Sequence, residues 1–190
     1  MLSEKQGSIL IRLARQTIAE HTHLSVDDPV QKEELADPDL QAKRGVFVTL
    51  NKHGALRGCI GSLVGQESIV GGVCRNALNA AFHDSRFPPV TADEVPELHI
   101  DVSVLSEPRS LAYADGQDLI HKLRPHIDGV ILRAPGGAGA TFLPQVWEQL
   151  PDPQLFLSHL CLKAGLPQTA WKSGQLEVDT YQVQHFEENE

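Results

Sequence analysis

The chain has 190 residues, of which 41% are hydrophobic, so it is long and apolar enough to form a packed core. Its formal net charge of −9, from 16 basic and 25 acidic residues, disfavours a nucleic-acid-binding protein that relies on bulk positive charge. Three cysteines without a CxxC pair and no apolar run of membrane-spanning length lead us to expect a cytoplasmic protein with neither a disulfide framework nor a membrane anchor.

The first predicted element is a helix over residues 3–20. Ser3 and Gln6 form a capping-box pattern, and apolar residues follow with a period of 3.6. Charges interrupt this apolar stripe, so the segment does not resemble a signal peptide. The polar, proline-containing residues 21–43 are predicted as a loop. The next predicted elements are a β-hairpin over 46–62, a helix over 68–82, a short helix that Thr91 caps, and a strand over 98–105.

The second half of the chain begins with a polar linker over residues 106–116, which we expect to separate two lobes. The smaller lobe is predicted to take in about residues 106–150 of a single 1–190 domain. The pattern predicts α+β architecture with two unequal lobes, in which helices pack on mostly antiparallel sheets. The elements expected after the linker are a short helix over 118–123, a hairpin over 128–147, a helix from Pro144, a helix that Asp152 caps, and a strand over 175–186.

The stretch LRGCIGSL, residues 56–63, places an arginine, a cysteine and two glycines in a predicted strand. Arg57 and Cys59 are expected on one face of this strand, about 7 Å apart, where a guanidinium favours the reactive thiolate. Gly58 and Gly61 carry no side chains, so a ligand or another backbone can approach closely. We interpret the four residues as a substrate-binding patch with Cys59 as the candidate catalytic residue. The alternative is that Cys59 is a small core residue and Arg57 a structural ion-pair partner.

A second candidate lies in HDSRFPPV, residues 83–90, where Asp84 and Arg86 follow a predicted helix. These opposite charges are candidates for binding a polar substrate near Arg57. The alternative is a local salt bridge that fixes the loop. Both interpretations stay open at this point.

Other polar or sulfur-containing residues are predicted to be structural. His99, Asp101 and Ser103 share one face of a strand, but neighbours at i and i+2 stand about 6.6 Å apart, too far for a catalytic triad. We expect them to form a solvated or helix-covered polar face. Cys74 and Cys161 lie on apolar helical stripes and are interpreted as core residues.

No metal site and no cofactor are predicted. The nine histidines are scattered through the chain, and no HExxH pattern occurs. The pairs formed by His21 with His23 and by His121 with His126 are interpreted as surface residues. The glycine-rich residues 134–141 lack the lysine of a phosphate-binding loop, so they are predicted as a hairpin turn.

The order of several motifs resembles that of the AMMECR domain family, whose bacterial and archaeal branch is called AmmeMemoRadiSam system protein A. The motifs that carry the resemblance include LRGCIGSL, AAFHDSRFPPV, DVSVLSEP and ATFLPQVWEQLP. The similarity extends from about residue 5 to the C-terminus, and LRGCIG is its most specific phrase. One departure is Ser85, where many members have proline.

The resemblance implies an α+β fold of two unequal lobes. It also implies association with a Memo-like protein, similar to class III extradiol dioxygenases, and with a radical-SAM enzyme. It points to Arg57, Gly58, Cys59 and Gly61 as the site but supplies no reaction, so it leaves open whether the protein is an enzyme. Two hypotheses follow: a component of a modification pathway that binds or attacks a substrate at this patch, or a non-catalytic adaptor that presents the patch to a partner protein.

Overall fold

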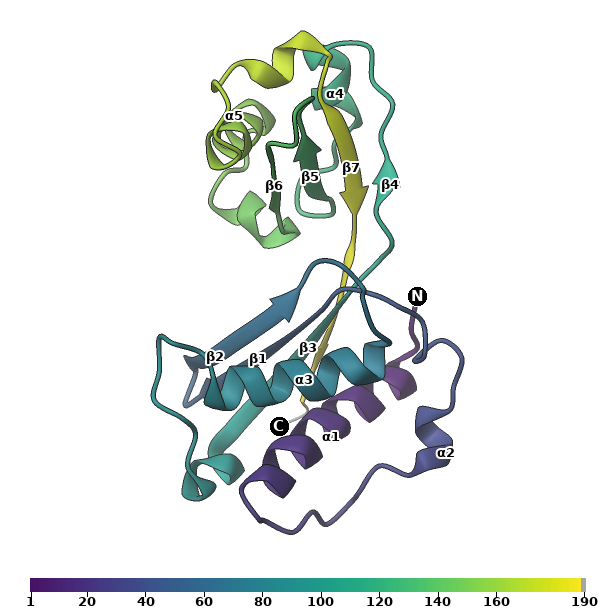
Figure 1. The fold of residues 1–190 in the computed structure, drawn as a ribbon, viewed down its shortest axis with the longest axis vertical. Helices are drawn as coiled ribbons and strands as arrows, with labels where there is room; N and C mark the ends of the chain where they lie inside the picture. The colour runs from purple at the N-terminus through teal and green to yellow at the C-terminus, as the bar shows by residue number, and fades with distance from the viewer. Residues whose placement is uncertain (189–190) are drawn as a thin grey trace. The chain divides into compact units, whose positions relative to one another are not determined.

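The computed structural model describes residues 1–188 and divides the chain into two compact units (Figure 1). The first unit contains Met1–Leu105 and the chain from Gln184 onward, and the second contains Ser106–Val183. The α+β architecture is confirmed, because each unit combines helices with its own four-stranded sheet. The second unit extends well past residue 150, the predicted end of the smaller lobe, because a later helix and strand complete its core.

The first unit has a sheet with strand order β2-β1-β3-β8. The N-terminal helix begins at Ser3, where the predicted capping box with Gln6 is present. The elements of this unit are α1 (Glu4–His21), α2 (Lys32–Leu35), β1 (Val46–Lys52), β2 (Ala55–Ser62), α3 (Ile69–Phe82), the 3₁₀ helix η1 (Ala92–Glu97), β3 (Leu98–Leu105) and β8 (Val183–Glu187).

The two faces of this sheet differ in character. On β1, Val46, Val48 and Leu50 are fully buried in one core with the apolar residues of α1 and α3. Because side chains alternate along a strand, Phe47 and Thr49 point to the opposite face. We call this opposite face the polar face; its polar residues are Thr49, Asn51, Cys59, His99, Asp101, Ser103, His185 and Glu187.

The second unit has a sheet with strand order β4-β7-β5-β6. Its core contains Trp147, whose ring stacks on Phe156 with centroids 3.7 Å apart and whose Nε1 donates to the carbonyl of Asp128 at 2.7 Å. The elements of this unit are β4 (Arg109–Ser110), α4 (Gly116–Lys122), β5 (Gly129–Arg133), β6 (Gly139–Phe142), the 3₁₀ helix η2 (Pro144–Glu148), α5 (Pro153–Lys163), the 3₁₀ helix η3 (Ala170–Ser173) and β7 (Glu177–Tyr181).

The structure corrects two predicted elements. The strand expected over 175–186 is two strands, because β7 pairs with β5 in the second sheet and β8 joins β3 in the first. The loop expected over 21–43 contains the one-turn helix α2. The predicted cap of α5 by Asp152 is confirmed. Within residues 1–188, no helix has the length and apolar character that crossing a membrane requires.

Candidate functional site

The LRGCIG stretch forms most of β2, an edge strand that pairs with β1. Cys59 lies opposite Thr49 and Gly61 opposite Phe47, so both belong to the polar face. A bulge between Leu50 and Asn51 leaves Arg57 as the extra residue of β2. The expected simple alternation of Arg57 with Cys59 is therefore interrupted by this bulge.

Arg57 forms an ion pair with Glu94 of η1. Its Nε and Nη2 donate to the two carboxylate oxygens at 3.1 and 3.0 Å, and its side chain is 11% exposed. The Arg57 guanidinium, the Thr91 N–H and Lys52 lower the pKa of Glu94 from its ordinary 4.5 to about 2. Within the described residues, Nη1 of Arg57 is buried and has no hydrogen-bond partner. The sequence left a structural ion pair open as an alternative, and this is the role in which the structure places Arg57.

The two glycines of the stretch face other parts of the protein. A Cβ atom at Gly58 would lie 2.1 Å from the carbonyl oxygen of Ala80, so the missing side chain allows β2 to approach α3. At Gly61 a Cβ would lie 2.2 Å from Cδ1 of Phe47, whose ring occupies that space. Of the two alternatives that the sequence left open, a ligand or another backbone, the structure shows the backbone at Gly58, and at Gly61 it shows the ring of Phe47.

Asp84 and Arg86 bind the backbone of Cys59. The Asp84 carboxylate accepts from the Cys59 N–H at 2.9 Å, and Arg86 Nη2 donates to the Cys59 carbonyl at 3.2 Å. Asp84 and Arg86 also pair directly at 2.6 Å. Hydrogen bonds from Arg86 and from the Cys59 N–H hold the pKa of Asp84 well below its usual range. The pair thus satisfies backbone groups on the open edge of β2, and it lies beside Cys59, while Arg57 points to Glu94.

The thiol of Cys59 lies on the polar face, whereas Cys74, which is also half-buried and accepts from the Thr17 hydroxyl at 3.6 Å, packs against the apolar core. Cys59 is half-buried, and the Thr49 hydroxyl donates to its Sγ at 3.2 Å. Cys161 is buried in the second unit, and burial raises the pKa of its thiol and of the Cys74 thiol. Cys59 is therefore the cysteine that the structure places on a polar surface.

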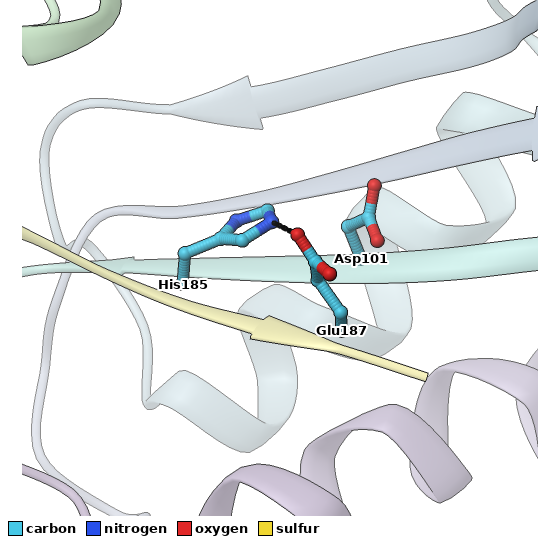
Figure 2. Close-up of side chains that lie close together, drawn as sticks. All are labelled: Asp101, His185 and Glu187. Carbon is cyan, nitrogen blue, oxygen red and sulfur yellow. Dashed lines mark hydrogen bonds and ion pairs between the residues drawn. The ribbon is translucent and has the colours of Figure 1, made fainter. Parts of the chain in front are cut away.

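Further polar residues lie in the same rows of the sheet as Cys59. Thr49 is paired with Cys59 on one side and with Asp101 on the other. Asp101 accepts from Asn51 at 2.8 Å, and burial raises the pKa of its carboxyl group. On the neighbouring strand, His185 Nδ1 lies 3.1 Å from the Ser103 hydroxyl. His185 Nε2 lies 3.0 Å from a carboxylate oxygen of Glu187, completing a cluster with Asp101: Asp101, His185 and Glu187 (Figure 2).

Comparison with known proteins identifies the family. The AMMECR1 family model matches residues 11–186. The chain belongs to the AMMECR1 family. A protein of Thermofilum pendens is 37% identical to it over 98% of this chain and 92% of that protein, and one of Methanothermobacter thermautotrophicus is 36% identical over 99% and 97%. The crystal structure of an uncharacterised protein from Pyrococcus horikoshii has a TM-score of 0.79 at 33% identity, covering 99% of this chain and 94% of that one.

Membership of the AMMECR1 family covers both units and therefore the strands that carry Cys59, Asp101 and His185. The names of these relatives state no activity. Sequence reasoning missed His185 and Glu187, although their i and i+2 spacing in a strand placed them on one face. The spacing does not reveal that β8 lies beside β3. This neighbour depends on contacts between residues more than 80 positions apart, such as Ser103 and His185.

Removing Asp84 is expected to weaken the first unit and to loosen Cys59. Asp84→Ala leaves the Cys59 N–H without its acceptor, and we expect a loss of about 2 kcal/mol in the free energy of unfolding. The loss stays moderate because Arg86 is 53% exposed and can be solvated. Urea unfolding measures it, with Asp28→Ala as a control that removes a surface partner of Arg12. Equal stability of the two variants would contradict the edge-binding role.

Proposed function

We propose that this AMMECR1-family protein binds a substrate on its polar face as one component of a modification pathway, with Cys59 as the group that holds or attacks the substrate. The observation that carries the proposal is the position of the Cys59 thiol on a polar surface, where the Thr49 hydroxyl donates to its sulfur. This hydrogen bond holds the sulfur at the polar face, on the side of the sheet away from the apolar core. The thiolate is the form of cysteine that acts as a nucleophile.

The partners proposed for this pathway are a Memo-like protein and a radical-SAM enzyme. The support for them is the resemblance of the motif order to the AmmeMemoRadiSam branch of the family. The net charge of −9 further favours protein or small-molecule partners over nucleic acid. Three free cysteines fit a reducing compartment, and we propose a cytoplasmic location.

A second candidate function is a non-catalytic adaptor that presents the polar face to a partner protein. Two observations favour it. The Arg57 guanidinium is paired with Glu94, and the space beside Gly58 is filled by the backbone of α3. Both residues therefore stabilise the unit rather than contact a ligand. In this case Cys59 contributes shape and polarity without reacting.

The rate of alkylation tests the role of the thiol. With iodoacetamide and the folded protein, we expect Cys59 to react at least about ten times faster than Cys161, because only an accessible thiolate is alkylated. Mass spectrometry of the peptides with time gives each rate, and Cys74 serves as a second internal reference. Thr49→Val should slow the reaction of Cys59 by removing the hydroxyl donor. If all three cysteines are alkylated only in denaturant, Cys59 does not act as a nucleophile in the folded protein.

A pair of cellular measurements separates the enzyme component from the adaptor. Cells that carry Cys59→Ser are compared with wild-type cells in an untargeted survey of metabolites, RNA and protein modifications. If Cys59 reacts, the variant cells should lack a product that the wild-type cells contain. Capture of partner proteins by the same variant should be unchanged in either case. A product profile equal to that of wild type, with partners retained, would favour the adaptor.

A further inference from the structure

We infer that Asp101, His185 and Glu187 form a binding site for a divalent transition-metal cation on the polar face. Their ligand atoms, one nitrogen and two carboxylate oxygens, all lie within 4.8 Å of one another. The three side chains come from the neighbouring strands β3 and β8 and gather on one side of them (Figure 2). Imidazole and carboxylate are the ligands by which proteins hold Zn²⁺ and related ions.

The distances require only small adjustments for an ion to bind. In the tetrahedral arrangement that Zn²⁺ prefers, two ligand atoms about 2.1 Å from the ion are about 3.4 Å apart. His185 Nε2 and the Glu187 oxygen are already 3.0 Å apart, so both can contact one ion. The Asp101 oxygen, which lies up to 4.8 Å from the other ligand atoms, then needs to move by up to about 1.4 Å, and a carboxylate rotation supplies this.

Outer hydrogen bonds orient two of the three ligands. The Ser103 hydroxyl lies 3.1 Å from His185 Nδ1, which fixes the ring and leaves Nε2 for the ion. Asn51 Nδ2 donates to Oδ2 of Asp101 at 2.8 Å, and Oδ1 of Asp101 lies 3.5 Å from His99 Nε2. Partners of this kind accompany the histidine and carboxylate ligands of protein metal sites. Hydrogen-bond partners outside the cluster therefore hold two of its candidate metal ligands in place.

The charges of the cluster are not balanced by the protein. The Asp101 side chain is 12% exposed, and within residues 1–188 its ion-pair partner is His99, at 3.5 Å, rather than an arginine or lysine. By contrast, Asp84 is paired with Arg86 and Glu94 with Arg57. A largely buried carboxylate next to a second carboxylate is costly unless a cation compensates it. A bound metal ion supplies this compensation.

The exposure of the ligands indicates an open site. The side chains of His185 and Glu187 are 43% and 66% exposed, so an ion held by three protein groups keeps positions for water or a substrate, as in catalytic sites. Cys59 lies two strands from Asp101 in the same row, about 10 Å away, and is not a ligand. A Ser103–His185–Glu187 triad is less well supported, because strand backbone committed to the sheet offers no oxyanion hole.

Isothermal titration of the untagged full chain with ZnCl₂ tests this inference. We expect one Zn²⁺ per chain, with affinity at least tenfold weaker in His185→Gln and in Asp101→Asn, because each removes a ligand. Ser103→Ala should weaken binding by about tenfold through the ring orientation. The matched control is His53→Asn, which removes the histidine of an exposed pair with Glu97 and should leave the affinity unchanged.

Three results would overturn the site. The first is binding by wild type that is no tighter than binding by His185→Gln, and the second is an equal loss of affinity in His53→Asn and His185→Gln, which would indicate general surface binding. Loss of Zn²⁺ binding in Cys59→Ser would place the ion at the thiol instead. Circular dichroism confirms that each variant is folded. The inferred metal site does not depend on the proposed function. Zn²⁺ binding by a protein whose Cys59 is unreactive would therefore reject the proposed function and leave the metal site intact.

Discussion

Gly58→Val is expected to lower the free energy of unfolding by about 3 kcal/mol or more, because added volume at a tightly packed backbone forces strand and helix apart. Even the first added carbon would lie 2.1 Å from the carbonyl oxygen of Ala80, and this neighbour is backbone that no rotamer change can move. Urea unfolding of the purified variant measures the effect. Gly58→Ala should show a smaller loss with the same sign.

Gly71→Ala is the control for Gly58→Val, since it also adds volume at a glycine, here one in α3, the helix that Gly58 approaches. There the new Cβ meets the end of the flexible Glu67 side chain at 3.1 Å, and we expect a change within about 1 kcal/mol. The interpretation of Gly58 as part of a substrate-binding patch favours a different result for Gly58→Val, a larger effect on function than on folding. A Gly58→Val protein with wild-type stability and impaired substrate binding would restore that interpretation.

Local chemistry made part of the fold predictable. The capping box of Ser3 and the cap at Asp152 involve groups within three residues of each other, so the sequence pattern is sufficient to locate them. The division of residues 175–186 between two sheets was not predictable, because alternation along a strand does not reveal its partner. For the same reason the sequence did not reveal that the second unit extends to Val183.

In the candidate site, too, the sequence indicates features that depend on nearby residues but not those that depend on distant contacts. Cys59 was identified from its unusual surroundings in the strand, and Asp84 and Arg86 were identified as a pair. Their contact with the Cys59 backbone spans 25 residues or more and depends on the edge position of β2. For Gly58 the sequence left a ligand and another backbone open, because a glycine required by a ligand and one required by a helix look alike in a sequence. His185 was missed because its partner Ser103 lies 82 positions away.

Glu94→Ala is expected to cost about 3 kcal/mol of stability, because it leaves the guanidinium of Arg57 buried and unpaired. Arg57 is 11% exposed, and its Nη1 already lacks a partner among the described residues, so little else can compensate the charge. The loss of the hydrogen bond from the Thr91 N–H to Glu94, at 3.1 Å, adds to the effect. Glu97→Ala is the matched control on the same helix: it also removes a partner of Lys52, but at 43% exposure, and should change stability by less than about 1 kcal/mol.

The dependence on pH separates the charge of Glu94 from its packing. The pKa of Glu94 in the folded protein is lowered from its ordinary 4.5 to about 2, so ionised Glu94 stabilises the fold above pH 4.5, and this stabilisation is lost as the pH falls towards 2. In Glu94→Gln, which keeps the shape but not the charge, that contribution is absent at every pH. The stability difference between wild type and Glu94→Gln should therefore be constant near neutral pH and shrink between pH 4.5 and 2. A difference that stays constant over this acid range would show that Arg57 is stabilised by packing alone, and the ion pair would then contribute nothing to holding the bulge of β2 against η1.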